Sequence, residues 1–124
     1  MKTSTLIGPP LDWAVSECEY QYIQKHEGHV KPWVLEQHRA GATCPIDWCN
    51  LGPIIERELI SIAPIWRNAG CKNTTGEWLW QASLVTEDGK SVWGNPCLNP
   101  LEAAARCYVA SVLGDEVELP EILR

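Results

Sequence analysis

Residues 99–114 read NPLEAAARCYVASVLG, and this stretch carries the strongest structural signal in the chain. Asn99 is a typical helix-capping residue, Pro100 suits the first helical position, and Glu102 follows the cap by three residues. The apolar side chains then recur at helical spacing: Leu101, Ala104, Ala105, Tyr108 and Val112. Gly114 supplies a stop. The stretch therefore predicts an amphipathic helix over about 100–113.

The segment before this helix predicts a β-hairpin near 77–93. Residues 77–85 alternate, with one face made of Trp78, Trp80, Ala82 and Leu84. The dipeptide Asp88-Gly89 is a hairpin-turn signal, and the β-branched and aromatic residues 91–93 follow it. An antiparallel pair of strands is the prediction for this region.

Weaker signals place the remaining elements. Leu11, Ala14, Val15 and Cys18 have helical spacing after Pro9-Pro10, which predicts a helix over about 11–21. The pattern at 54–58 fits either a helical turn or a turn entering a strand. We expect strands at 59–63 and 30–35, the latter inside a loop-rich segment, 24–50, and a loop at 68–76. Together these elements predict a single α+β domain over 1–124, with the sheet packed by the two helices.

Composition and charge restrict the classes of partner. The 124 residues are 45% apolar, which supports one hydrophobic core, and the formal net charge is −6. Because duplex-binding domains gain most of their affinity from a basic face, we expect no duplex nucleic acid partner. No apolar run reaches membrane-spanning length and no export signal is visible. We therefore expect no membrane partner and a location in the cytoplasm.

The six cysteines predict free thiols, since disulfides are rare in a reducing compartment. Cys18 and Cys107 lie on apolar helical faces and are interpreted as core residues. A zinc site is the alternative, because Cys44 and Cys49, and His26 and His29, form close pairs. Neither pair has the spacing of a zinc knuckle, so we expect no metal and no other cofactor.

Seven tryptophans and no phenylalanine make the aromatic content unusual. Indoles fill cores, but they also stack on ligands and anchor interfaces. Seven exceed the need of so small a core, so we expect two or three of them to line a pocket or an interface.

Three blocks of sequence resemble one known family. They are Leu11-Asp12-Trp13-Ala14-Val15, then Asp47-Trp48 with Gly52-Pro53-Ile54-Ile55-Glu56-Arg57-Glu58, and then residues 99–120. In this order they are similar to the NinX-like family of phage proteins. The resemblance implies a tailed-phage or prophage product made in the bacterial cytoplasm. It implies no particular reaction.

The central block contains the group types that bind a purine nucleotide. Trp48 offers a face for stacking, Asp47 and Glu56 offer carboxylates for hydroxyl or amine groups, and Arg57 offers a guanidinium for phosphate. A core Trp beside a surface Glu–Arg pair is the alternative interpretation. Arg106 is equally open, since it either faces solvent or reaches a ligand. The predicted ligand-binding residues are Asp47, Trp48, Glu56, Arg57, Trp13, Trp78, Trp80 and Arg106.

Three functional hypotheses follow. The resemblance to small phage proteins favours a counter-defence protein that sequesters a nucleotide-derived immune signal, of cyclic ADP-ribose or cyclic dinucleotide type, without cleaving it. Such binders are often homo-oligomers. The second hypothesis is an interaction module that inhibits a host defence effector or assists phage replication. The third is an enzyme that degrades such a signal. We expect no catalytic residues, because no nucleophile–base arrangement, phosphate loop or metal set is visible.

Overall fold

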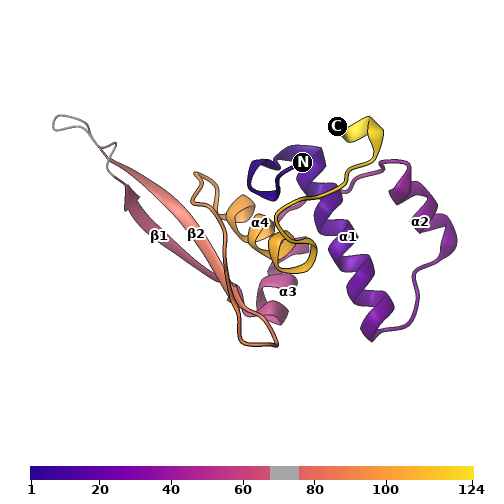
Figure 1. Ribbon diagram of the computed structural model, residues 1–124, viewed down its shortest axis with the longest axis horizontal. Coiled ribbons are helices and arrows are strands. Elements are labelled where there is room, and N and C mark those ends of the chain that lie inside the picture. Colours follow the sequence, from indigo (N-terminus) through magenta and orange to yellow (C-terminus); the bar gives the residue numbers. More distant parts are fainter. Residues whose placement is uncertain (68–75) are drawn as a thin grey trace.

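The computed structural model describes residues 1–67 and 76–124, which form an α+β fold (Figure 1). Its helices are α1 (Gly8–His26), α2 (Pro32–Arg39), α3 (Trp48–Glu58) and α4 (Pro100–Leu113), with short 3-10 turns at Thr3–Thr5 and Glu121–Leu123. The strands are β1 (Ser61–Arg67), β2 (Glu77–Val85) and β3 (Ser91–Trp93), antiparallel in the order β1-β2-β3. The predicted fold class is confirmed. The loop predicted at 68–76 lies, apart from Gly76, outside the described residues.

Helix α4 forms the centre of the core. It packs against β2 on one side and α1 on the other, so that it lies between the sheet and α1 in Figure 1. Three consecutive alanines, residues 103–105, are fully buried or nearly so, which lets the neighbouring elements approach closely. Asn99 caps the helix by accepting a hydrogen bond from the backbone N–H of Leu101 at 2.8 Å, as predicted.

Helix α1 is longer than predicted at both ends. It begins at Gly8 because Pro9 and Pro10 occupy first-turn positions, where a backbone N–H would have no helical partner. It continues to His26 although its apolar stripe stops near Tyr20. Its last turns are held by polar and aromatic contacts with other elements, and apolar periodicity does not report such contacts.

The strand predicted at 30–35 is wrong, and the segment 24–50 contains more helix than expected. Pro32 occupies the first turn of α2, where its fixed φ favours a helix. His38 of α2 packs into the protein: its ring stacks on Trp13 at 4.3 Å, and its Nε2 lies 2.6 Å from a carboxylate oxygen of Glu17. This contact with α1 fixes the position of α2, and the local sequence of α2 gives no indication of it.

Helix α3 also begins earlier than predicted. Asp47 caps it, accepting a hydrogen bond from the backbone N–H of Asn50 at 2.8 Å, and the helix then passes through Gly52-Pro53. The buried side chains of Leu51 and Ile54 explain this continuation, since they belong to the same core cluster as α4. The strand predicted at 59–63 exists but is displaced to 61–67.

The residue that ends α3 is conformationally strained. Leu59 has φ 54° and ψ 49°, the left-handed region, and its side chain is 80% exposed. Because a Cβ atom is disfavoured there, Leu59→Gly is expected to raise the free energy of unfolding by about 0.5–1 kcal/mol. Urea unfolding measures the change. Leu98→Gly is the control: Leu98 is also largely exposed, at 72%, but has no positive φ, so that glycine should destabilise.

The two ends of the described chain pair with each other. The backbone N–H of Thr3 donates to Asp115 O at 2.9 Å, and that of Val117 donates to Met1 O at 2.8 Å. The hydroxyl of Thr3, which is buried, donates to Gly114 O at 2.6 Å. In Figure 1 both marked ends lie at the top of the molecule. None of the helices in the described ranges has the length and apolar character needed to cross a bilayer.

Candidate functional site

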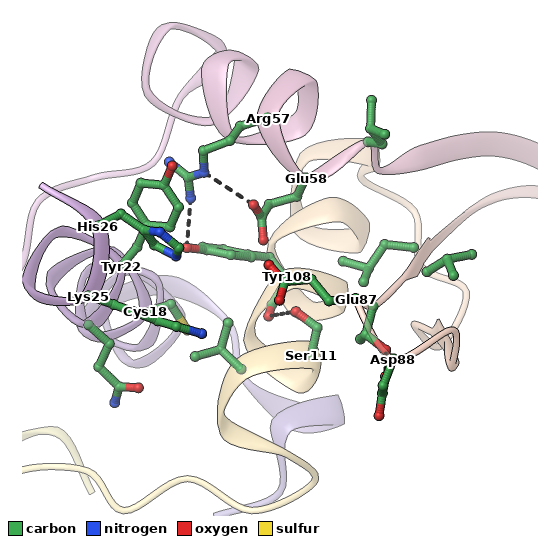
Figure 2. A pocket seen from close by; sticks show the side chains of 16 residues that line it. Cys18, Tyr22, Lys25, His26, Arg57, Glu58, Glu87, Asp88, Tyr108 and Ser111 are labelled. Atoms are coloured by element: carbon green, nitrogen blue, oxygen red, sulfur yellow. Dashed lines mark hydrogen bonds and ion pairs between the residues drawn. The ribbon is translucent and has the colours of Figure 1, made fainter.

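A pocket of about 660 Å³ lies between α1, α3, α4 and the end of β2 (Figure 2). Its floor contains Cys18 and Tyr108, both buried. One wall is the last turns of α1, with Tyr22, Lys25 and His26, and the opposite wall is the β2–β3 turn. The volume is within the range typical of small-molecule sites, about 300–1,000 Å³.

Arg57, near the end of α3, is fixed at the edge of this pocket. Its two terminal nitrogens bind both carboxylate oxygens of Glu19, at 3.3 and 3.1 Å, and its Nε donates to Glu58 at 3.2 Å. It also donates to the hydroxyl of Tyr108 at 3.0 Å, and its guanidinium lies 3.7 Å from the centre of the Tyr22 ring. These four hydrogen bonds use all but one of the five guanidinium N–H groups.

In this network the charge of Arg57 is neutralised by carboxylates of the protein, Glu19 and Glu58. Burial alone would lower the pKa of Arg57, but the hydrogen bonds and charges of Glu19 and Glu58 outweigh it, so the pKa is raised. Burial, followed by the charge of Glu19, raises the pKa of Tyr108 well above its usual range. The phenol therefore stays protonated and donates to Glu19 at 3.4 Å. The predicted phosphate-binding role of Arg57 does not suit a guanidinium bound by two carboxylates.

The part of the pocket that remains open has walls of opposite charge. Lys25 and His26 are exposed on the α1 side, and His26 lies against Tyr22, with the ring centres 4.5 Å apart. Glu87 and Asp88 are exposed on the facing turn. Hydrogen bonds from Thr86 and from the backbone of Lys90 lower the pKa of Asp88, so this carboxyl is ionised. Figure 2 shows the two walls facing each other across Tyr108.

The chemistry available in the pocket depends on its Cys18 thiol and on the side chains that could act as metal ligands. Burial, with the charges of Glu17 and Glu19, raises the pKa of Cys18 well above its usual range, so its thiol is not a ready nucleophile. In the described part of the chain, no three His, Cys, Asp or Glu side chains converge as metal ligands would. Cys18 and Cys107 are buried, as interpreted, whereas Cys44 and Cys49 are exposed.

Of the predicted residues of the central block, Arg57 lines this pocket, and Asp47, Trp48 and Glu56 do not. Asp47 caps the first turn of α3, and Trp48 beside it is 55% exposed. Arg57 lies at the other end of the same helix, and Glu56 is exposed. Nine residues of α-helix span about 13 Å, which separates the indole from the guanidinium.

The other predicted residues are distributed over the molecule. Trp13 is a core residue that donates from Nε1 to His38 O at 2.6 Å, and Trp80 is half-buried against the core. Trp78 is 61% exposed at the far end of β2. Arg106 donates to Leu6 O at 2.8 Å and lines a second cleft of about 340 Å³, which also contains Trp93.

Sequence reasoning predicted Arg57 but missed the other charged and aromatic residues that line the pocket, and it missed Glu19, which binds Arg57. Tyr108 was assigned to the apolar stripe of its helix, correctly, but its hydroxyl also reaches the pocket edge. Glu19, Tyr22 and Lys25 lie at positions i, i+3 and i+6 of α1, which places them near one another on the helix surface. This spacing could have indicated a shared surface from the sequence alone, but only if the helix had been predicted to continue past residue 21.

Comparison with known proteins agrees with the blocks noted in the sequence. The family described as Bacteriophage P22, NinX matches residues 2–112, which include α1, α2, α3 and all of α4 except its last residue. No curated protein matches the chain. Because the match covers most of the length, the chain belongs to the bacteriophage P22 NinX family.

Proposed function

We propose that this phage protein binds and sequesters a nucleotide-derived immune signal, of cyclic ADP-ribose or cyclic dinucleotide type, without cleaving it. The observation that carries the proposal is the pocket between α1 and the β2–β3 turn, with its walls of opposite charge. A nucleotide-derived molecule presents anionic phosphates and, elsewhere, hydroxyl and amine donors. Such a molecule therefore needs a pocket that has both a cationic and an anionic wall.

The pocket contains a cation, carboxylates and an aromatic ring, the three types of group that the sequence analysis had assigned to other residues. In this proposal Lys25 and His26 bind the phosphate, and Glu87 and Asp88 accept hydrogen bonds from ribose hydroxyls or an exocyclic amine. The half-buried phenol ring of Tyr22 takes the place of the expected indoles, and the buried Tyr108 forms part of the floor. Arg57 acts indirectly, because its contacts with both rings fix the wall.

Sequestration is favoured over cleavage by the protonation of the pocket groups. The Cys18 thiol and the Tyr108 phenol both have raised pKa values and stay protonated at neutral pH. The exposed carboxylates Glu87 and Asp88 are neighbours on one turn, so they do not flank a bound molecule from two sides. Tight binding needs neither a nucleophile nor a base.

The test is thermal unfolding of the purified protein against a panel of cyclic ADP-ribose isomers and cyclic dinucleotides. A ligand at about one hundred times its Kd adds roughly 2.7 kcal/mol, which raises the midpoint by several degrees. The bound compound should be recovered intact after denaturation. Recovery of a product would instead establish an enzyme, and no shift with any compound would overturn the proposal.

A pair of charge reversals locates the site. Lys25→Glu should weaken binding on the order of tenfold or more, because it removes a charged phosphate contact and adds repulsion. Lys31→Glu is the matched control, since Lys31 is exposed outside the pocket and the reversal changes the net charge equally. Equal loss in both variants would show that only net charge matters, and would contradict the assigned site.

A protein-interaction module is the second candidate, and the exposed tryptophans favour it. Trp33, Trp48, Trp66, Trp78 and Trp93 are each more than half exposed. Indoles are preferred anchors of protein interfaces. A host defence effector or a phage replication protein is the partner under this hypothesis. If no nucleotide shifts the unfolding midpoint, capture of one such protein, abolished by a tryptophan substitution, would establish it.

A further inference from the structure

Arg106 of α4 carries a charge for which the described residues provide few hydrogen-bond acceptors. Its side chain is only 11% exposed, and its Nε donates to Leu6 O at 2.8 Å. A carboxylate oxygen of Glu102 lies 4.0 Å from a terminal nitrogen, which is beyond hydrogen-bond distance. The N–H groups on the two terminal nitrogens therefore have no acceptor among residues 1–67 and 76–124.

Arg57 gives a comparison within the same chain. Its side chain is more exposed, at 27%, but its guanidinium donates to Glu19, Glu58 and Tyr108. A cation removed from water costs free energy unless hydrogen bonds compensate for the loss. Arg106 is the more buried of the two and has fewer of these bonds. A bound anion would supply the missing acceptors.

The cleft that Arg106 lines has room for a small anion. Its volume of about 340 Å³ is near the lower end of the range for small-molecule sites, about 300–1,000 Å³. Arg106 and Ala110 of α4 line it, together with residues 2–4 and 115–116. A backbone hydrogen bond of 2.9 Å joins these last two segments. The fold itself therefore holds this side of the cleft in place, which lowers the cost of ordering it when a ligand binds.

An exposed indole lies at the same cleft. Trp93, at the end of β3, is 64% exposed and lines the cleft together with Asn95. Gly94 between them is buried, and a Cβ atom there would lie 3.4 Å from Ala103 O on α4. This close approach brings the end of β3 against the helix that carries Arg106. An indole beside a guanidinium suits a flat ring that carries an oxyanion.

The charges around the cleft restrict the kind of anion. Lys2 and Arg106 are cationic, whereas Asp115 and Glu116 are anionic. Glu116 lies 3.5 Å from the N-terminal amine and is paired with it. Asp115 and the net charge of −6 disfavour a polyanion such as a nucleic acid. The cleft is suited to a small molecule with one anionic group.

We propose that this cleft is a second binding site, for a small aromatic oxyanion. Its phosphate or carboxylate binds the terminal nitrogens of Arg106, and its ring packs on Trp93. The proposal goes beyond the sequestration of a nucleotide signal and does not depend on it, because the cleft and the pocket beside α1 share no lining residue.

NMR titration of the ¹⁵N-labelled full chain tests the proposal. Phenyl phosphate and benzoate are the probes, and inorganic phosphate is the comparison without a ring. The Arg106 Nε–H and Trp93 indole N–H signals should shift together, with a Kd on the order of 1 mM for a probe of this size. Trp93→Phe assigns the indole signal. The probe that binds more tightly identifies the oxyanion, and inorganic phosphate should bind at least about tenfold more weakly.

Two variants of equal charge locate the site. Asn95→Asp adds a carboxylate beside Arg106 and should weaken probe binding on the order of tenfold. Asn95 is exposed, so the fold should be unaffected. Gln24→Glu is the matched control, since Gln24 is exposed on α1 outside the cleft, and this variant should bind like the wild type. Arg106→Lys keeps the charge but removes the planar fork, so it should also weaken binding.

Three outcomes would overturn the proposal. The first is that neither signal moves at probe concentrations of about ten times the expected Kd. The second is that inorganic phosphate binds as tightly as phenyl phosphate, which would show an adventitious ion only. The third is equal weakening by Asn95→Asp and Gln24→Glu, which would make net charge the cause. A nucleotide signal bound in the first pocket should stabilise Asn95→Asp as much as the wild type, so the two proposals fail separately.

Discussion

Arg57→Met is expected to lower the free energy of unfolding by about 3 kcal/mol, because it leaves two carboxylates without their shared counter-ion. The side chains of Arg57, Glu19 and Glu58 are each only about a quarter exposed, at 27%, 25% and 28%. Without the guanidinium, Glu19 keeps only the weak hydrogen bond from Tyr108. Urea unfolding at pH 7 measures the loss.

Glu56→Gln is the matched control, since Glu56 precedes Arg57 on α3 but is exposed; its effect should stay within about 0.5 kcal/mol. The double variant Arg57→Met, Glu19→Gln should lose less than the sum of the two single losses, because the second change removes the orphaned charge. A loss below about 1 kcal/mol for Arg57→Met would show that the network is solvent-screened and would refute its structural role.

Alkaline pH is expected to destabilise the protein strongly. Burial raises the pKa of Cys107 from 9.0 to about 11. As the pH rises above 9 the unfolded chain loses this proton, while the folded chain keeps it until about 11. Unfolding then releases a proton, so the free energy of unfolding falls by about 1.4 kcal/mol per pH unit, or about 3 kcal/mol across the window. Below pH 9 this contribution is complete and constant.

Denaturant unfolding at a series of pH values from 8 upwards would follow this decline. Burial, as the first cause, also raises the pKa values of Cys18 and Tyr108, so Cys18 steepens the decline from about pH 9 and Tyr108 from about pH 10, and both extend it to higher pH. Cys107→Ala should make the slope between pH 9 and 11 shallower, whatever its effect at pH 8. Cys49→Ala is the control, because Cys49 is exposed and should leave the slope unchanged. An equal slope in all three proteins would contradict the assignment to Cys107.

The elements that could be predicted are those whose signals are local. The α4 helix has its cap at Asn99, its proline and its apolar stripe within one continuous stretch, and the hairpin has the Asp88-Gly89 turn. By contrast, α2 depends on the stacking of His38 against Trp13, which is 25 residues earlier in the sequence. Glycine and proline locally disfavour a helix at Gly52-Pro53, but burial of Leu51 and Ile54 outweighs that preference in α3.

For the candidate site, the structure separates the residues that the sequence analysis had grouped together. The sequence placed a carboxylate, an aromatic ring and a cation within one block, but a helix spreads Asp47 and Arg57 over its two ends. The pocket instead draws Lys25 from α1 and Glu87 from the hairpin turn, which are far apart in sequence. No spacing rule connects such residues, so only the packing of α1 against α4 reveals them.

The pairing of residues 1–3 with 114–117 has a consequence for how the protein is made. Thr3 is synthesised 111 residues before Gly114, its hydrogen-bond partner. The apolar side of α1 likewise stays uncovered until α4 has been synthesised. Long-range contacts of this kind delay folding until most of the chain has been synthesised. During translation the early helix therefore remains uncovered and open to chaperones or to aggregation. A premature stop before α4 would release a chain in which α1, α3 and β2 lack the helix that they pack against.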